Sequence, residues 1–300
     1  MSAAREESLI FIVSQPRSGS SLLQQLLVNH PKITGVPESW FLLRAFSAYG
    51  FDEIESPFVQ RHARVNFENF LAALPDGRAR YEKLFRDFIL GTYGLAADPG
   101  CRYFVDKTPR YYHVTEQIRR FLPAARQLVL VRHPLAVFAS ILAYNFEGDL
   151  DRMTAAPGRQ GDLYLAPQVL ARLSRGEPGQ TQCRVRYEEL VTDTQNVLAG
   201  IQDFLGLSSG FNPVYKVDAA FRDGVGIDAK SVQRHDRPTA GYLEAWKQSL
   251  DSGAKVQAAR RYLKRLGADL LADLGYDLER SQQELDQHLA SLPLRQRLFG

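Results

Sequence analysis

Near its amino terminus the chain has a short apolar run, followed at once by a loop of small residues and then by a helical pattern. Residues 9–13 are continuously apolar, which is typical of a strand buried on both faces of a parallel sheet. Residues 14–20 are rich in Ser, Gly and Pro, and leucines then recur at helical spacing until Pro31. This order predicts an α/β protein in which the loop and the helix amino terminus bind an anion through backbone N–H groups.

The same alternation of strands and helices continues along the chain. We predict further strands at 33–36, 103–105, 127–131 and 184–187. Helical patterns occupy 67–74, 79–90, 114–121, 135–144, 195–205 and the region after Ala240. Together they predict an α/β fold with a doubly wound, mainly parallel central sheet flanked by helices. Residues 148–161 and 208–213 are rich in Gly, Pro and polar residues, so we predict surface loops there.

Composition narrows the class of protein. The 300 residues, 45% of them hydrophobic, suffice for a buried core, and we expect one domain over residues 1–300. A net charge of +3 is mild for a nucleic-acid binder and suits a small polyanionic ligand. Cys101 and Cys183 have no ligand-like spacing, so neither a disulfide nor a zinc site is predicted. Without a signal peptide or an apolar run of about 20 residues, we expect a cytoplasmic protein with no membrane span. No oligomeric state is predicted.

The loop after the first strand is the first candidate anion site. Gly19 lets the backbone approach an anion closely, and Arg17 supplies a fixed positive charge. Ser18, Ser20 and Ser21 offer hydroxyl donors. Taken alone, this segment is also typical of an ordinary Ser/Gly turn before a helix.

A second candidate site follows the predicted strand at 127–131. Arg132 stands at the strand end, and Ser140 lies eight residues further on, in the next helix. Two such side chains can hold one phosphate from two sides. A solvated Arg132 and a Ser140 used for packing are the alternative interpretation.

Both segments resemble motifs of one family, the sulfotransferases that use 3′-phosphoadenosine 5′-phosphosulfate (PAPS). Residues 15–23 resemble the family's 5′-phosphosulfate loop, which usually reads Pro, Lys or Arg, Ser, Gly, Thr, Thr or Ser, Leu. Residues 131–134 with Ser140 resemble its 3′-phosphate-binding strand and helix, including the eight-residue spacing. Residues 186–191, leading to 204–207, are similar to the following segment, in which a tyrosine, here Tyr187, lies near the adenine.

The resemblance covers roughly residues 9–250 and implies fold, donor and reaction. The implied fold is the P-loop-like sulfotransferase architecture, and the implied donor is PAPS. The implied reaction moves a sulfonate group to a hydroxyl of an acceptor and releases 3′,5′-adenosine bisphosphate (PAP). A metabolite, a saccharide, a lipid, a carrier-bound intermediate and a protein tyrosine all remain open as acceptors.

One departure from other phosphate loops bears on the alternatives. The P-loop of kinases has a lysine after its last glycine, and here Ser20 holds that place. This disfavours a small-molecule kinase. A sulfonate carries fewer negative charges than a terminal phosphoryl group, so side-chain and backbone donors suffice and no metal is predicted. A non-catalytic adenosine-phosphate-binding protein would keep both anion sites and lack a base.

Four residues are candidates for catalysis. In-line transfer needs charge stabilisation, for which Arg17 is the candidate, and a base for the acceptor hydroxyl. The resemblance assigns the base to Glu38, which several branches carry after the short strand; a surface or helix-capping glutamate is the alternative. Lys107, in a segment that looks like the family's Asp-Lys-Thr-Pro, would face the sulfonate, or be a solvated strand-end lysine. His113 matches no motif but competes as the base, since the small-molecule branch uses histidine.

The remaining expectations concern the carboxyl-terminal half and the acceptor. Residues 226–230 and Arg237 resemble the loop that closes over the donor, although Ala229 replaces the usual proline and no clear Arg-Lys-Gly run is present. Lys230 and Arg237 are therefore candidates for binding the donor. A mobile basic loop without that role is the alternative. Segments 40–98 and 144–178 are expected on the acceptor side, and 278–300 as a helical tail. Aromatic residues such as Trp40 and Phe46 suit a partly apolar acceptor or the core equally.

Overall fold

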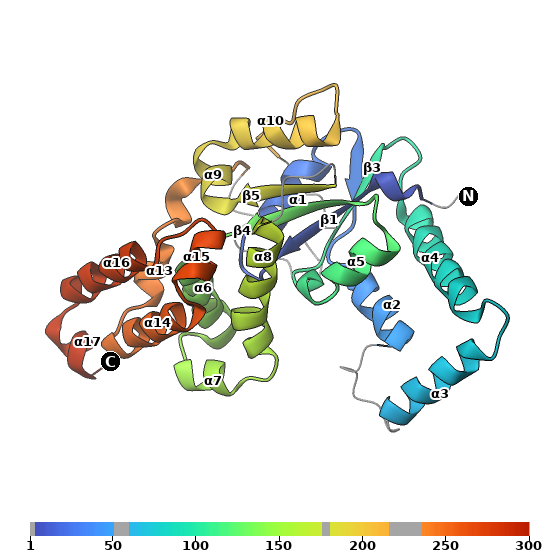
Figure 1. Ribbon diagram of the computed structural model, residues 1–300. Coiled ribbons are helices and arrows are strands. Elements are labelled where there is room, and N and C mark those ends of the chain that lie inside the picture. Colours follow the sequence, from blue (N-terminus) through green and yellow to red (C-terminus); the bar gives the residue numbers. More distant parts are fainter. Residues whose placement is uncertain (1–3, 51–59, 176–180, 216–235, 300) are drawn as a thin grey trace.

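The computed structural model describes residues 4–50, 60–175, 181–215 and 236–299 as an α/β protein (Figure 1). The strands are β1 (Leu9–Ser14), β2 (Ile33–Gly35), β3 (Tyr103–Lys107), β4 (Arg126–Val131) and β5 (Gln182–Arg186). The helices of the first half are η1 (Glu6–Ser8), α1 (Ser20–Val28), α2 (Phe41–Gly50), α3 (Gln60–Ala72), α4 (Gly77–Ala96), η2 (Tyr111–His113), α5 (Thr115–Phe121) and α6 (Pro134–Phe146). Those of the second half are α7 (Leu150–Ala155), η3 (Gly161–Leu165), α8 (Ala166–Arg175), α9 (Tyr187–Thr192), α10 (Thr194–Leu205), η4 (Ala240–Tyr242), α13 (Ala245–Ser249), α14 (Gly253–Leu266), α15 (Ala268–Asp273), α16 (Leu278–Ser291) and α17 (Leu294–Phe299).

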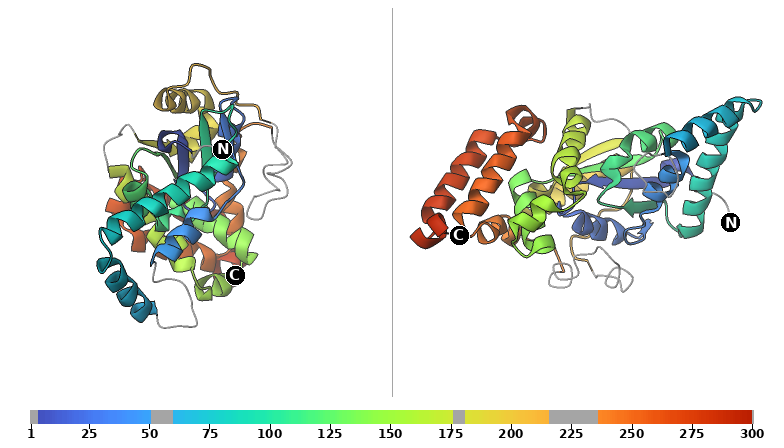
Figure 2. Two further views of the ribbon diagram at one scale, coloured as in Figure 1. Left: turned by 90° about the vertical axis from the view of Figure 1, so that its right-hand side faces the viewer. Right: turned by 90° about the horizontal axis from the view of Figure 1, so that it is seen from below.

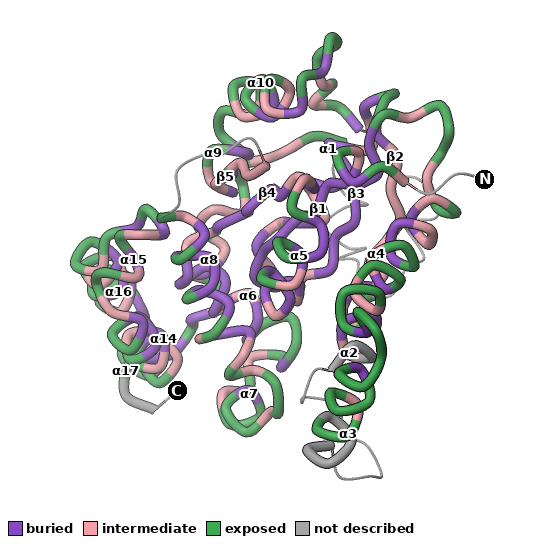
Figure 3. Tube along the Cα trace, turned by 45° about the vertical axis from the view of Figure 1, so that its right-hand side comes forward, coloured by how far each residue is buried: buried purple, intermediate pink, exposed green. Residues whose placement is uncertain are grey.

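The five strands form one parallel sheet in the order β2-β3-β1-β4-β5. All six residues of β1 are buried, as Figure 3 shows for the centre of the molecule. Side chains alternate between the two faces along the strand: Ile10 and Ile12 belong to one core cluster, and Phe11 belongs to the cluster on the opposite face. The continuous apolar run therefore reflects a strand covered on both sides.

Helices cover both faces of this sheet (Figures 1 and 2). Leucines of α1, α9 and α10 pack against Ile10 and Ile12 on one face. On the other face, α6 and α8 belong to one core cluster, and α2, α4 and α5 to another. This arrangement confirms the predicted doubly wound α/β fold.

Two groups of helices lie beyond the sheet, at opposite ends of the molecule (Figure 2). One is the pair α3 and α4, near β3, and the other contains α14 to α17, beyond α6 and α8. In the second group, α16 packs against α14, and Leu285 and Leu292 are buried in the shared core. The predicted carboxyl-terminal tail is therefore docked on the domain over its described residues.

The predicted loop at 148–161 is wrong in its first half, because it contains α7. Asp149 caps this helix by accepting a hydrogen bond from the N–H of Arg152 at 2.9 Å, and Met153 is buried in the core. A six-residue helix that buries one methionine has no apolar period to detect. No helix in the described ranges is both long and apolar enough to cross a membrane.

Candidate active site

The loop between β1 and α1 has the backbone geometry of an anion cradle. Arg17 has φ +68° and Gly19 has φ +89°, so the chain turns sharply before Ser20 begins the helix. The N–H of Leu23 donates to the carbonyl of Gly19, and the N–H groups at the start of the helix before it have no partner within the helix. Ser18 Oγ is buried and, within the part of the chain that the structure describes, lacks a hydrogen-bond partner. These groups fit an anion held at the helix amino terminus.

Gly19 also permits a close contact with Tyr187, the first residue of α9. A Cβ added at Gly19 would stand 2.6 Å from Cε2 of the Tyr187 ring. The loop and β5 with its following helix therefore meet only because position 19 has no side chain.

We expect Gly19→Ala to lower the free energy of unfolding by about 1–3 kcal/mol, because the positive φ and the tyrosine ring both oppose a side chain. Gly91→Ala is the matched control, since a Cβ there meets nothing within 4 Å in helix α4. Urea unfolding of both variants measures the difference. Equal stability of the two variants would contradict the close contact.

The second motif lies against the first. Arg132 Nη1 donates to the carbonyl oxygen of Arg17 at 3.0 Å, and Arg17 Nε donates to Ser140 Oγ at 3.2 Å. The Arg132 guanidinium lies 4.2 Å above the ring of Tyr187, and burial lowers its pKa. Arg17 stacks on the ring of Tyr144 at 3.9 Å. Two strand ends that are more than 100 residues apart in sequence thus present their arginines to one place.

One cavity of about 590 Å³ joins these groups. Its lining includes these predicted site residues: Arg17, Gly19, Ser20, Ser21, Glu38, Arg132, Ser140, Tyr187 and Arg237. Lys107 lies beneath this lining, and His113 in η2 is not part of it but packs on the ring of Tyr112 at 4.3 Å. Lys230 lies outside the described residues. The structure therefore gathers most of the predicted site and leaves His113 aside.

Lys107 and Glu38 form a buried ion pair next to the loop. Lys107 Nζ lies 2.8 Å from Glu38 Oε1 and 3.3 Å from Ser21 Oγ, and the two charged side chains are 1% and 4% exposed. Burial lowers the pKa of Lys107, and the Glu38 carboxylate acts in the opposite direction. The pair forms because β2 and β3 are neighbouring parallel strands whose carboxyl ends meet at one edge.

A second buried carboxylate supports this pair from below. Oδ2 of Asp106 accepts hydrogen bonds from the hydroxyls of Ser39, Tyr93 and Tyr111 at 2.6 to 2.7 Å. Burial raises the pKa of Asp106, while the three hydroxyls and Lys107 act to lower it. Because Ser39 follows Glu38, these bonds fix the backbone that carries the glutamate.

Tyr111→Phe should destabilise the fold by about 1.5–3 kcal/mol at neutral pH, since it removes a donor to a buried charge. The folded-state pKa of Asp106 lies above its ordinary value of 3.8. The contribution of Asp106 to the free energy of unfolding is therefore fully present below pH 3.8. It is lost as the pH rises through the folded-state pKa. The substitution raises that pKa further, so its effect should shrink in mild acid. Unfolding curves across this pH range test it, and an effect independent of pH would contradict it.

Several residues of the cavity belong to no motif in the sequence. Arg110, three residues after Lys107, and Arg159, inside the predicted loop, both line it, as do Tyr144 and Trp246. Of the predicted aromatic residues, Trp40 lines the cavity whereas Phe46 belongs to the core. Arg110 lies at the end of the Asp-Lys-Thr-Pro stretch, which was the only signal for it in the sequence.

The fold and this cavity define a class: P-loop-like α/β proteins with a cavity at the carboxyl ends of parallel strands. Among the described residues, no group of three or more His, Cys, Asp or Glu side chains is placed to hold a metal ion. The model of the Sulfotransferase family matches residues 9–213, and the chain belongs to this family.

Known proteins resemble the chain as follows. Nodulation protein NoeE of Sinorhizobium fredii is 29% identical, with 90% of this chain aligned to 66% of that protein, just under two thirds of its length. The sulfotransferase domain from the curacin biosynthetic pathway shares the fold with a TM-score of 0.50 and 24% identity, over 95% of this chain and 98% of that domain. The sulfotransferase domain of the Synechococcus PCC 7002 olefin synthase gives a TM-score of 0.49 and 20% identity, over 85% of this chain and 94% of that domain.

Proposed function

We propose that this protein is an enzyme that transfers the sulfonate group of PAPS to a hydroxyl of an acceptor and releases PAP. The observation that carries the proposal is the contact between the two predicted phosphate motifs, in which Arg132 donates to the Arg17 carbonyl and Arg17 donates to Ser140. Both motifs line one cavity. Membership of the Sulfotransferase family supports the same reaction, since sulfonate transfer from PAPS is the general reaction of that family.

The residues around the cavity fit the donor's two phosphate groups. We assign the 5′-phosphosulfate to the loop and the 3′-phosphate to Arg132 and Ser140. In the loop, the donors are Arg17, the N–H groups at the start of α1 and the hydroxyls of Ser18, Ser20 and Ser21. Ser18 Oγ, which is buried and has no hydrogen-bond partner among the described residues, supports this assignment. Tyr187 would flank the adenine, and Arg237 lines the same cavity.

Arg17 acts as an electrostatic clamp on the leaving phosphate. Its contacts with Ser140 and with the ring of Tyr144 hold the guanidinium in place. Because a guanidinium stays protonated, it stabilises developing charge without donating a proton.

Glu38 is the base that accepts the proton of the acceptor hydroxyl. It lines the cavity, whereas His113 does not. Lys107 lies between Glu38 and Ser21 of the phosphate loop, so its ammonium group faces both the base and the position of the transferring sulfonate. The sulfur atom of the sulfonate forms a bond to the acceptor oxygen as its bond to the 5′-phosphate oxygen breaks.

Three cations near the loop make a metal clamp unnecessary in this proposal. Arg17, Lys107 and Arg132 supply the positive charge, and Ser20 holds the place of the kinase lysine.

A transfer assay with ³⁵S-labelled PAPS tests the proposal. The panel of acceptors holds matched pairs of hydroxyl compounds, such as glucose with glucuronate and methyl 3-hydroxybutyrate with 3-hydroxybutyrate. We expect labelled product and an equal amount of PAP with at least one acceptor, without added metal. Phosphoryl transfer from ATP to the same panel, with no consumption of PAPS, would show a kinase instead.

A further inference from the structure

We propose that the acceptor carries a carboxylate or phosphate group, which Arg110 and Arg159 bind beside Glu38. We call these two residues the arginine pair. The inference rests on the proposed function, because it assigns the acceptor class of the same cavity.

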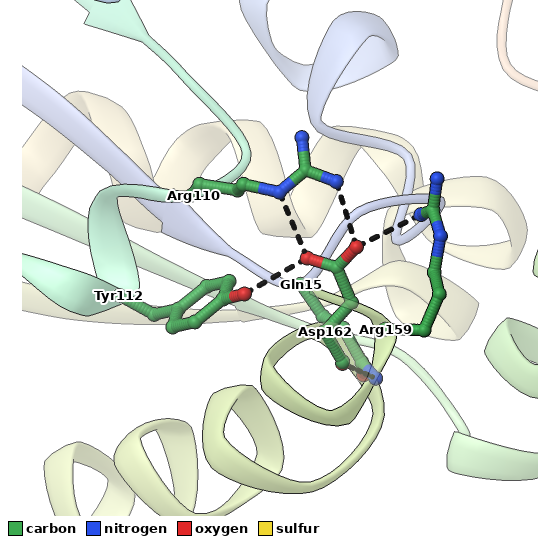
Figure 4. Close-up of polar contacts among 5 residues, drawn as sticks. All are labelled: Gln15, Arg110, Tyr112, Arg159 and Asp162. Carbon is green, nitrogen blue, oxygen red and sulfur yellow. Dashed lines mark hydrogen bonds and ion pairs between the residues drawn. The ribbon is translucent and has the colours of Figure 1, made fainter. Parts of the chain in front are cut away.

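A single buried carboxylate holds the arginine pair (Figure 4). Asp162, in the π-helix η3, is fully buried and accepts from Arg110 Nε at 3.1 Å, from Arg110 Nη2 at 2.7 Å and from Arg159 Nη1 at 2.8 Å. The hydroxyl of Tyr112 also donates to Asp162, at 2.8 Å. Both guanidinium groups are therefore oriented by fixed partners.

Within the residues that the structure describes, the remaining guanidinium nitrogens of Arg110 and Arg159 are available to a ligand. In Figure 4 the outer nitrogens of Arg110 and Arg159 point to the same side, away from Asp162. The two side chains are 31% and 20% exposed, and both line the cavity. Two guanidinium groups on one carboxylate leave one net positive charge. A second anion would neutralise it.

The arginine pair lies on the acceptor side of the cavity. Arg110 lies 5.6 Å from the ring of Trp40, two residues after Glu38. Burial acts to lower the pKa of Arg110, but the carboxylates of Asp162 and Glu38 hold it above its ordinary value, which places Glu38 in electrostatic range. Arg132 interacts instead with Tyr187, Glu188 and Arg17. An anion on the arginine pair is thus separate from the 3′-phosphate that we assign to Arg132.

The cluster is also tied to the phosphate loop. Gln15 Nε2 donates to the main-chain carbonyl of Asp162 at 2.7 Å. Arg110 already engages both oxygens of Asp162, so Arg159 is a second cation on one carboxylate. The second arginine, held at the cavity wall, favours a ligand-binding role.

The test measures binding of inorganic phosphate to protein saturated with PAP, through the unfolding temperature at constant ionic strength. PAP fills the two donor phosphate subsites and leaves the sulfonate position open, so the part of a further rise in unfolding temperature that Arg159→Gln removes reports the arginine pair. We expect this rise in wild type and its loss in Arg159→Gln, with phosphate bound about tenfold to a hundredfold more weakly. Arg159→Lys, which keeps the charge, should retain part of it. Because each variant is compared with itself, a lower starting stability does not obscure the result.

Arg280→Gln is the matched control, since Arg280 is 80% exposed, pairs with Glu284 on α16 and does not line the cavity. A phosphate shift that is absent in wild type, or unchanged in Arg159→Gln, overturns the inference. In the transfer assay, the anionic member of each matched pair should be preferred about tenfold in kcat/KM, and Arg159→Gln should reduce that preference through KM. A preference for the uncharged member also overturns it.

The two proposals fail separately. If PAP does not bind or PAPS is not consumed, the proposed function fails. The difference in the phosphate shift between wild type and Arg159→Gln still decides whether the arginine pair binds an anion.

Discussion

Glu38→Gln is expected to lower kcat by about 10²- to 10⁴-fold, the range typical for loss of a positioned general base. Glutamine keeps the shape of the side chain and cannot accept the proton of the acceptor hydroxyl. The Kd for PAP should change little, because Glu38 is not among the donor-binding groups assigned above. Rapid-quench measurement of a single turnover, together with calorimetry of PAP binding, separates chemistry from binding.

The substitution leaves Lys107 buried without its carboxylate partner, which costs about 3–5 kcal/mol of stability for a broken buried pair. The unfolding temperature must therefore be measured beside the rate. Glu116→Gln is the matched control, since Glu116 is 56% exposed on α5 and does not line the donor cavity. A folded Glu38→Gln protein that binds PAP and keeps its kcat would remove Glu38 from the mechanism.

Arg132→Ala is expected to raise the Kd for PAP by about a hundredfold, as two charge-assisted hydrogen bonds of about 1.5 kcal/mol each are lost. The Kd for 5′-AMP should change much less, because that ligand lacks the 3′-phosphate. Calorimetry with both ligands measures the selectivity.

Arg126→Ala gives a control from the same strand, since Arg126 begins β4 at the edge opposite Arg132 and donates to the Glu7 carbonyl at 2.6 Å. An equal loss of affinity for PAP and 5′-AMP in Arg132→Ala would mean that Arg132 does not read the 3′-phosphate.

The parts of the fold that were predictable from sequence are those whose signal is local. The apolar run of β1, the small-residue loop and the leucines of α1 are contiguous, so their order alone indicates a strand, an anion-binding turn and a helix. The strand at 127–131 and the helix after Pro134 are equally local, and Pro at the first helical position marks the boundary.

The parts that were not predictable depend on distant neighbours. The ion pair of Lys107 and Glu38 requires β2 beside β3, which no local pattern states. Arg159 enters the cavity because Asp162, turned inward on a π-helix, also holds Arg110 from a segment some 50 residues away. Glycine and proline in residues 148–161 favoured a surface loop, so neither helix α7 nor the position of Arg159 was predicted.

The most direct test of the central claim is calorimetric titration of wild-type protein with PAP and with ATP, without metal and again with Mg²⁺. We expect tight, metal-independent binding of PAP and much weaker binding of ATP in both conditions. Preference for ATP, or binding that requires Mg²⁺, would contradict a PAPS-dependent sulfotransferase.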